Sequence, residues 1–199
     1  MLTNEGFPVL LADTNRGNVN AARMAGLPTF FGNILAESAM EKLNLDGIGR
    51  MLAVTANDEA NSLASLHFAE VFDRSEVYQL TVGKEAEEGD RKDTPLHLRG
   101  RSLFGNGRTY EDLTDRYFHG AMIKVTQLSD EFDFAAFQEF YGEKAVPLFL
   151  ITEKGELKVF TQAHALKPES GARLLSLVLP IETPVENATS ENDPNVELA

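Results

Sequence analysis

The sequence contains no cysteine and no tryptophan. Without cysteine there is no disulfide, no thiolate ligand for zinc and no cysteine nucleophile, so disulfide-stapled secreted proteins and several enzyme classes are excluded. The chain also lacks an apolar run of about 20 residues, the length that a membrane-spanning helix needs. Its first residues do not show the basic and then apolar pattern of a signal peptide. We therefore expect a soluble cytosolic protein.

Basic residues are scarce. The 199 residues include 18 lysines and arginines against 31 aspartates and glutamates, which gives a net charge of −13. Such a chain repels phosphate backbones and anionic lipids, so we expect no nucleic-acid binding and no direct membrane insertion. Hydrophobic residues make up 43% of the chain. That content is enough for one medium domain or two small ones that share an interface.

The sequence carries no recognisable catalytic or metal-binding pattern. The four histidines do not pair at metal-ligand spacing, and we expect one of them, His67, to pack in the core. No nucleophile elbow, zinc-protease motif or Walker loop is present. A general base, a nucleophile and an oxyanion donor cannot be assembled from these residues, so we predict that the protein is not an enzyme and binds no metal.

The first 82 residues alternate between short apolar runs and helical patterns. The apolar runs are continuous, which is typical of parallel strands buried on both faces, and they span Pro8–Ala12, Pro28–Phe31, Arg50–Val54 and Val77–Val82. Helices are predicted between them at Asn18–Ala25, Ser38–Leu43 and Asn57–Phe72. The apolar face of the longest helix is predicted to comprise Ala60, Leu63, Ala64, His67, Phe68, Val71 and Phe72. This order predicts a truncated Rossmann-like domain over residues 1–82, built on a parallel sheet.

The rest of the chain has a different pattern. Residues 83–108 are rich in charge and glycine, which indicates a linker or exposed loop. Residues 109–180 predict a small α+β accessory domain with an antiparallel sheet. Its helices are expected at Thr109–Phe118 and Asp130–Tyr141, the second capped by Ser129, and its strands at Ala121–Leu128, Val146–Thr152, Leu157–Thr161 and Arg173–Leu179. Residues 181–199 form a polar, acidic segment that we expect to be disordered.

Polar residues follow three of the predicted parallel strands. Asp13 ends the first strand in "VLLADTNRGNV", where a dinucleotide-binding fold places the acid that binds the adenosine ribose. Capping of the next helix explains Asp13 equally well. "FFGN" closes the second strand with Gly32 and Asn33, and "VTANDEAN" begins the longest helix, where free backbone N–H groups suit an anion. Each is also typical of an ordinary turn or helix cap, but ligands of open α/β sheets bind at this edge, so we expect the three motifs to lie together there.

A complete dinucleotide-binding fold has one further part. It opens with a strand and a Gly-x-Gly-x-x-Gly turn about twenty residues before the ribose acid. Only twelve residues precede Asp13, so the first strand and the glycine loop are missing. The segment "FGNGRTY" does not replace them because it lacks the third glycine and follows a polar segment.

The stretch "PVLLADTNRGNVNAARMAGLPTFFGNILAESAMEKLNLDGIGRMLAVTANDEANSLASLHFAEVF" resembles the RCK or TrkA-N (KTN) domain. This nucleotide-binding domain regulates bacterial potassium channels, potassium uptake systems and cation/proton antiporters. The sequence is most similar to the form at the C-terminus of sodium/proton antiporters. The motifs "ADTNR", "FGN" and "TANDEAN" carry the resemblance, in order and at suitable spacings. In the family these motifs contact NAD(H), ATP or a related adenine nucleotide.

The resemblance implies a role for each motif. It would place Asp13, Asn15 and Arg16 near the ribose, Asn33 and Ile34 near the adenine, and Thr55, Ala56, Asn57 and Asp58 toward the distal half of the ligand. It implies a regulatory, nucleotide-sensing domain of a monovalent cation transporter, a homodimer attached to a membrane-embedded partner at the cytoplasmic face. Two alternatives stay open: a dimerisation module that has lost its nucleotide, and an NAD-dependent enzyme.

Overall fold

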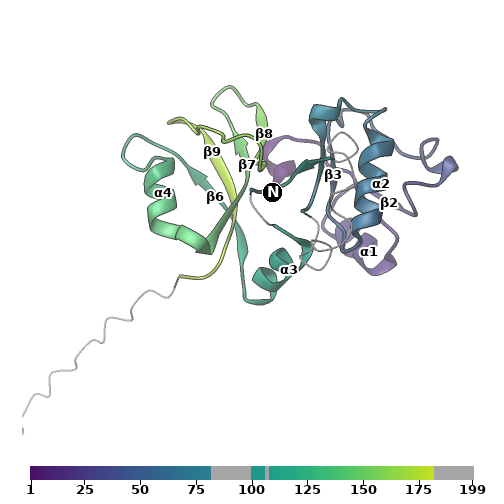
Figure 1. Ribbon diagram of the computed structural model, residues 1–199, viewed down its shortest axis with the longest axis horizontal. Helices are drawn as coiled ribbons and strands as arrows, with labels where there is room; N and C mark the ends of the chain where they lie inside the picture. Colours follow the sequence, from purple (N-terminus) through teal and green to yellow (C-terminus); the bar gives the residue numbers. More distant parts are fainter. Residues whose placement is uncertain (82–99, 106–107, 182–199) are drawn as a thin grey trace, which may run out of the picture.

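The computed structural model describes residues 1–81, 100–105 and 108–181. Figure 1 shows two parts side by side, one built on parallel strands with α1 and α2, the other on an antiparallel sheet with α4 on its outer face. The strands are β1 (Leu11–Asp13), β2 (Thr29–Phe31), β3 (Met51–Ala53), β4 (Val77–Gln79), β5 (Arg101–Ser102), β6 (Met122–Gln127), β7 (Ala145–Ile151), β8 (Leu157–Val159) and β9 (Arg173–Val178). The α-helices are α1 (Arg16–Met24), α2 (Asp58–Phe68), α3 (Tyr110–Phe118) and α4 (Phe134–Tyr141).

The predicted fold class is confirmed, because parallel sheets with helices precede a small antiparallel α+β part. β1 pairs with β2, and β3, β4 and β5 form a second parallel sheet. The antiparallel sheet has the order β6-β9-β7-β8. The expected single parallel layer is therefore divided into two sheets. No helix within the described residues is long and apolar enough to cross a membrane.

Two helix predictions in the first 82 residues need correction. The segment expected as a helix at Ser38–Leu43 forms only a 3-10 turn at Glu37–Ala39. The helix expected at Asn57–Phe72 ends at Phe68, and its buried face differs from the predicted one: Asn61, Ala64, Ser65 and Phe68 are buried, while Leu63 is 56% exposed and His67 is exposed. The buried residues are spaced as on one face of a helix, but two of them are polar. A prediction from hydropathy alone therefore placed the buried face on the neighbouring, more apolar side of the helix.

The segment 100–105, expected as part of a linker, is integrated into the fold. β5 runs parallel to β4. Gln79 holds it at two points: its carbonyl accepts from the Leu103 N–H at 2.9 Å, and its Oε1 accepts from the Gly100 N–H at 3.0 Å. The two apolar residues Leu103 and Phe104 are buried. They form too short an apolar run, among charged neighbours, for a strand to be predicted from the sequence. Residues 83–99 and 106–107 of the expected linker lie outside the described residues, as do Val82, the predicted end of the fourth strand, and the predicted disordered segment from residue 182.

The same segment connects the two parts. The Phe104 N–H donates to the Phe160 carbonyl at 2.8 Å, and the Gln162 N–H donates to the Ser102 carbonyl at 3.1 Å. An antiparallel bridge between Leu103 and Thr161 lies between these bonds. Residues 102–104 thus pair with the residues that follow β8, and these backbone hydrogen bonds connect the two parts.

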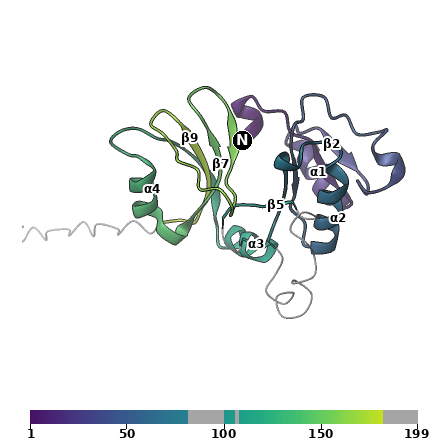
Figure 2. The same ribbon diagram turned by 45° about the horizontal axis from the view of Figure 1, so that its top comes forward.

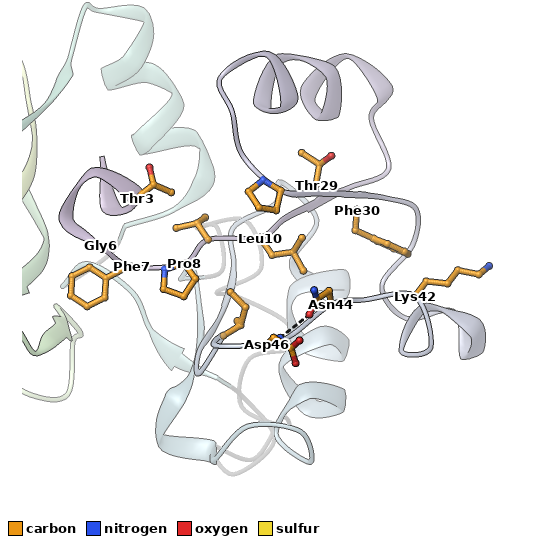
Figure 3. A pocket seen from close by; sticks show the side chains of 13 residues that line it. Thr3, Gly6, Phe7, Pro8, Leu10, Thr29, Phe30, Lys42, Asn44 and Asp46 are labelled. Atoms are coloured by element: carbon orange, nitrogen blue, oxygen red, sulfur yellow. Dashed lines mark hydrogen bonds between the residues drawn. The ribbon is translucent and has the colours of Figure 1, made fainter.

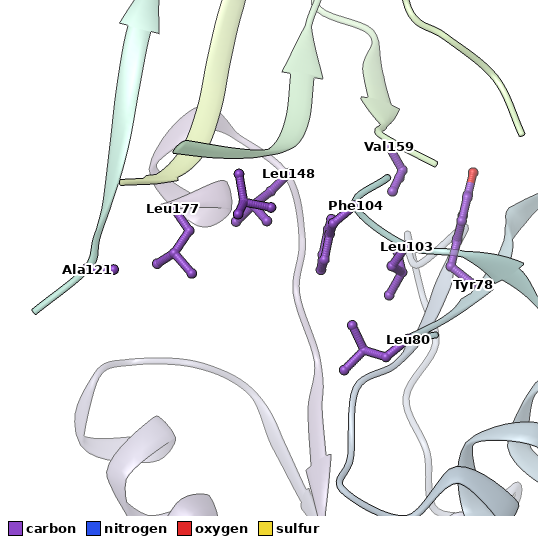
Figure 4. Close-up of a cluster of buried hydrophobic side chains, with 9 residues drawn as sticks. Tyr78, Leu80, Leu103, Phe104, Ala121, Leu148, Val159 and Leu177 are labelled. Carbon is purple, nitrogen blue, oxygen red and sulfur yellow. The ribbon is translucent and has the colours of Figure 1, made fainter. Parts of the chain in front are cut away.

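A shared hydrophobic core fills the junction (Figure 4). Leu103 lies at its centre with no exposed surface. The cluster combines residues of β4, of the segments just after β4 and β5, and of the antiparallel part: Tyr78, Leu80, Leu103, Phe104, Ala121, Val146, Leu148, Val159 and Leu177. Because apolar side chains from both parts bury one another here, neither part has this core alone.

The opposite face of the antiparallel sheet is covered by α4 (Figures 1 and 2). Phe137 and Tyr141 pack against Leu174 and Val178 of β9 in a second cluster. The cap of α4 is Asp133, whose side chain accepts from the Ala136 N–H at 2.8 Å. The predicted cap at Ser129 was therefore wrong, and the helix begins later than expected. All four strands predicted in this part are confirmed.

We predict that Gly100→Ala destabilises the protein. A methyl group at Gly100 would lie 2.8 Å from the Ser65 Oγ and 3.1 Å from the backbone carbon of Tyr78. Because β4 backbone cannot move easily, the free energy of unfolding in urea should fall by about 1–3 kcal/mol. Gly49→Ala is the control, since nothing lies within 4 Å of its added methyl group. Equal stability of the two variants would contradict the packing described here.

A second prediction concerns the pH dependence of stability. Burial, and then the negative charge of Glu76, raise the pKa of Tyr78 above its ordinary value. The unfolded state therefore loses this proton at lower pH than the folded state, so the stabilisation is complete below about pH 10 and is lost as pH rises toward the folded pKa. We expect Tyr78→Phe to show a smaller drop in unfolding free energy between pH 9 and 11 than the wild type. Parallel curves for the two proteins in urea would contradict this expectation.

Candidate functional site

Asp13 ends β1 and organises the turn into α1. Its Oδ1 accepts from the Asn15 N–H at 2.8 Å, and its Oδ2 accepts from the Asn18 Nδ2 at 2.7 Å. Asn15, rather than Asp13, is the N-cap of α1, because its side chain accepts from the Gly17 and Asn18 N–H groups. A carboxylate has about four acceptor positions. Asp13 thus stabilises the start of α1, and its carboxylate can still accept further hydrogen bonds.

Arg16 and Phe31 lie beside this turn. The Arg16 guanidinium is 5.0 Å from the centre of the Phe31 ring, within the range of a cation–π interaction. The Gly32 N–H donates to the Asp13 carbonyl at 3.1 Å, which joins the ends of β1 and β2. Phe31 is 47% exposed. A carboxylate, a guanidinium and an accessible aromatic ring therefore share one strand-end surface.

Asn33 and Ile34 follow Gly32 in a turn. The Asn33 Oδ1 accepts from the Leu35 N–H at 2.9 Å, and the Asn33 carbonyl accepts from the Ala36 N–H at 3.1 Å. Ile34 is half-buried. The Asn33 side-chain oxygen thus stabilises this turn, which lies at the same end of the β1-β2 sheet as Asp13.

The end of β3 is held by a buried asparagine. The Asn61 Oδ1 accepts from the Thr55 N–H at 3.1 Å and from the Thr55 hydroxyl at 2.7 Å. Its Nδ2 donates to the Thr55 carbonyl at 2.9 Å. Asn57 caps α2 by accepting from the Ala60 N–H at 2.7 Å. The loop, which also contains the exposed Ala56 and leads to Asp58 as first residue of α2, has a fixed backbone.

The predicted residues therefore form two groups. Asp13, Asn15, Arg16, Asn33 and Ile34 follow the strands of the β1-β2 sheet, whereas Thr55, Ala56, Asn57 and Asp58 follow β3 in the other parallel sheet. Their use as a common ligand site stays a prediction.

Residues 1–88 match the sequence model of the TrkA-N domain. This part of the chain is a TrkA-N domain. The match includes both groups of strand-end residues, and it confirms the resemblance on which the sequence interpretation was based. Domains of this family are regulatory domains of cation transport systems.

One similar solved structure is described as the crystal structure of the GsuK RCK domain. It has a TM-score of 0.33 and 11% sequence identity, and the alignment covers 85% of this chain and 43% of that one. The present chain thus spans less than half of that structure. No curated protein matches the sequence.

Three residues of the TrkA-N domain were missed from the sequence. Asn18 is the third residue of α1, a position where an amide often supports the helix start. Asn61 is a polar residue on the buried face of α2, and a buried side-chain amide normally has hydrogen-bond partners within the protein. No sequence pattern marks Phe31 as a binding residue. Phe30 and Phe31 are consecutive aromatic residues, and the sequence does not indicate which of the two side chains is exposed.

A cavity lies at the opposite end of β1 and β2 from these groups (Figure 3). Its volume is about 570 Å³. Most of its lining is apolar, and the residues are Thr3, Gly6, Phe7, Pro8, Val9, Leu10, Pro28, Thr29, Phe30, Lys42, Asn44, Asp46 and Ile48. None of the predicted site residues lines it. The TrkA-N strand-end residues, rather than this cavity, occupy the edge where open α/β sheets bind ligands.

We predict that Asn61→Ala destabilises the TrkA-N domain. Asn61 is 1% exposed, and its removal leaves the Thr55 N–H and carbonyl without their partner. The free energy of unfolding should fall by about 1–3 kcal/mol. Asn20→Ala on the exposed side of α1 is the matched control and should change stability by no more than about 0.5 kcal/mol. Urea unfolding curves of both variants provide the measurement.

Proposed function

We propose that the chain is a cytosolic regulatory module of a monovalent cation transporter, of the sodium or potassium/proton antiporter type, and that it senses a nucleotide. The observation that carries this proposal is the TrkA-N match over residues 1–88, which contains every predicted strand-end residue. The ligand is NAD(H) or an adenine nucleotide. The partner is a membrane-embedded transporter domain or subunit, which holds the module at the inner face of the membrane, and the module forms a homodimer.

The β1-β2 strand ends fit the adenosine half of such a ligand. The Asp13 carboxylate has acceptor positions for ribose hydroxyls. The Phe31 ring, 47% exposed, offers a face for the adenine, and Arg16 supplies a guanidinium for a phosphate. Asn15, Asn33 and Ile34 complete this side of the site.

The phosphate side is less complete. Thr55, Ala56, Asn57 and Asp58 precede or begin α2, whose N-terminal N–H groups favour a negative charge. Within the described residues, however, no glycine-rich turn adjoins Asp13 to cradle a pyrophosphate. We therefore propose that the described residues contact mainly the ribose and the base.

Regulation would require no chemical step. A nucleotide that binds one arrangement of the two parts more tightly than another shifts the equilibrium toward it by the difference in binding free energy. The segment 100–105 is hydrogen-bonded to both parts, so it offers a physical connection between the TrkA-N domain and the antiparallel sheet. The attached transporter would respond to that shift.

Isothermal titration of the 199-residue chain with NAD, NADH, ATP and ADP tests this function. We expect at least one of them to bind with a submillimolar dissociation constant, and Asp13→Ala to weaken it by about tenfold or more, because hydrogen bonds to a charged group are lost. Asp130→Ala, an exposed acid outside the TrkA-N domain, is the control. Circular dichroism establishes that Asp13→Ala is folded.

Other outcomes would favour the alternatives. If no nucleotide binds below millimolar concentration, the proposal fails and a dimerisation module without a nucleotide becomes the better interpretation. Turnover of the nicotinamide absorbance with a candidate substrate would instead indicate an NAD-dependent enzyme, although no proton-transfer residue accompanies the predicted site.

A further inference from the structure

β6 is the open edge of the antiparallel sheet. In the order β6-β9-β7-β8, the β8 end is continued toward β5 by the bridge between Leu103 and Thr161. β6 has a neighbour on one side only within the described residues. It is also the farthest strand from the parallel part in the hydrogen-bonded order (Figure 1).

The backbone pattern identifies which groups face this open side. The Leu128 N–H donates to the Ala172 carbonyl of the neighbouring chain segment, and β6 pairs with β9 in register up to that point. In an antiparallel pair, alternate residues direct both backbone groups to the same neighbour. Ile123, Val125 and Gln127 therefore direct their N–H and C=O groups away from β9, toward the open side.

This edge lacks the usual protection against pairing. Exposed edge strands are commonly guarded by a bulge, a proline or a projecting lysine. β6 pairs with β9 in unbroken register and contains no proline. Its one lysine is turned onto α4: the Lys124 Nζ donates to the Tyr141 hydroxyl at 2.5 Å and lies 5.2 Å from the centre of the ring.

The strand β6 carries exposed apolar side chains and no acidic residue. Met122 is 72% exposed, and Phe118, just before the strand, is 79% exposed. The strand sequence "MIKVTQ" contains no aspartate or glutamate, although the chain carries a net charge of −13. Two such acidic chains repel each other, so they can meet most favourably where acidic side chains are missing.

We propose that β6 pairs antiparallel with β6 of a second copy across a two-fold axis at Val125. In this register Ile123 faces Gln127 of the second copy, Val125 faces its own counterpart, and all outward backbone groups of both strands are paired. An isologous contact of this kind is self-complementary by symmetry. The two antiparallel sheets thereby become one continuous sheet. This inference rests on the homodimer within the proposed function and specifies its interface.

The oligomeric state tests the inference separately from nucleotide binding. Sedimentation equilibrium of the full chain should show a dimer that dissociates on dilution, because a single strand pair is a small interface. Ile123→Asp places a charge at the edge and should raise the dimer dissociation constant at least tenfold. The matched control is Val71→Asp, which places the same charge at another exposed β-branched residue and should leave the dimer intact.

Amide hydrogen exchange of the unmodified protein provides a measurement that does not depend on the folding of a variant. Exchange at Ile123, Val125 and Gln127 should slow as protein concentration rises, while the amides that already bond to β9 should not change. A monomer at all concentrations, a dimer insensitive to Ile123→Asp, or protection of these amides that is independent of concentration would each overturn the inference. Nucleotide binding by a protein that fails these tests would leave the nucleotide-sensing part of the proposed function in place.

Discussion

The segment 100–105 is hydrogen-bonded on both of its sides, and these bonds hold the two parts of the protein together. Gln79 fixes the segment beside β4 through its own backbone and its buried side-chain amide. On the other side, Ser102 and Phe104 bond to residues just after β8. Leu103 can be fully buried between the two parts only because its backbone groups are satisfied within the protein, since an unpaired buried amide is costly.

This arrangement explains why small side chains are required at one place in the junction. Gly100 lies against the Ser65 Oγ and the backbone of β4, so helix α2, strand β4 and the entering segment meet at contact distance. The polar residues in the buried stripe of α2 have related roles. Asn61 fixes the end of β3, and Ser65 is small enough to admit the backbone at Gly100. Hydrogen bonding at Asn61 and the limited space beside Ser65, rather than local hydropathy, determine which face of α2 is buried.

At the strand ends of the TrkA-N domain, the residues that stabilise the fold are also those with the proposed binding role. Asp13, Asn15 and Asn57 form turns and caps that stabilise helix starts. Such bonds use part of each side chain's acceptor capacity and hold the backbone N–H groups in a fixed direction. A site built in this way needs little reorganisation to receive a ligand, which lowers the free-energy cost of binding. Helix capping and ligand binding are therefore compatible interpretations of Asp13.

Every strand except β5, the order of parallel before antiparallel structure, and the polar residues at the ends of β1, β2 and β3 follow from the sequence alone, because they depend on local hydropathy, turn residues and caps. The division of the parallel layer into two sheets, the buried face of α2 and the place of the segment 100–105 emerge only in the folded protein. Each of these depends on partners distant in the chain, such as Gln79 for Gly100 and Thr161 for Leu103. Local periodicity contains no information about which distant backbone will satisfy a hydrogen bond.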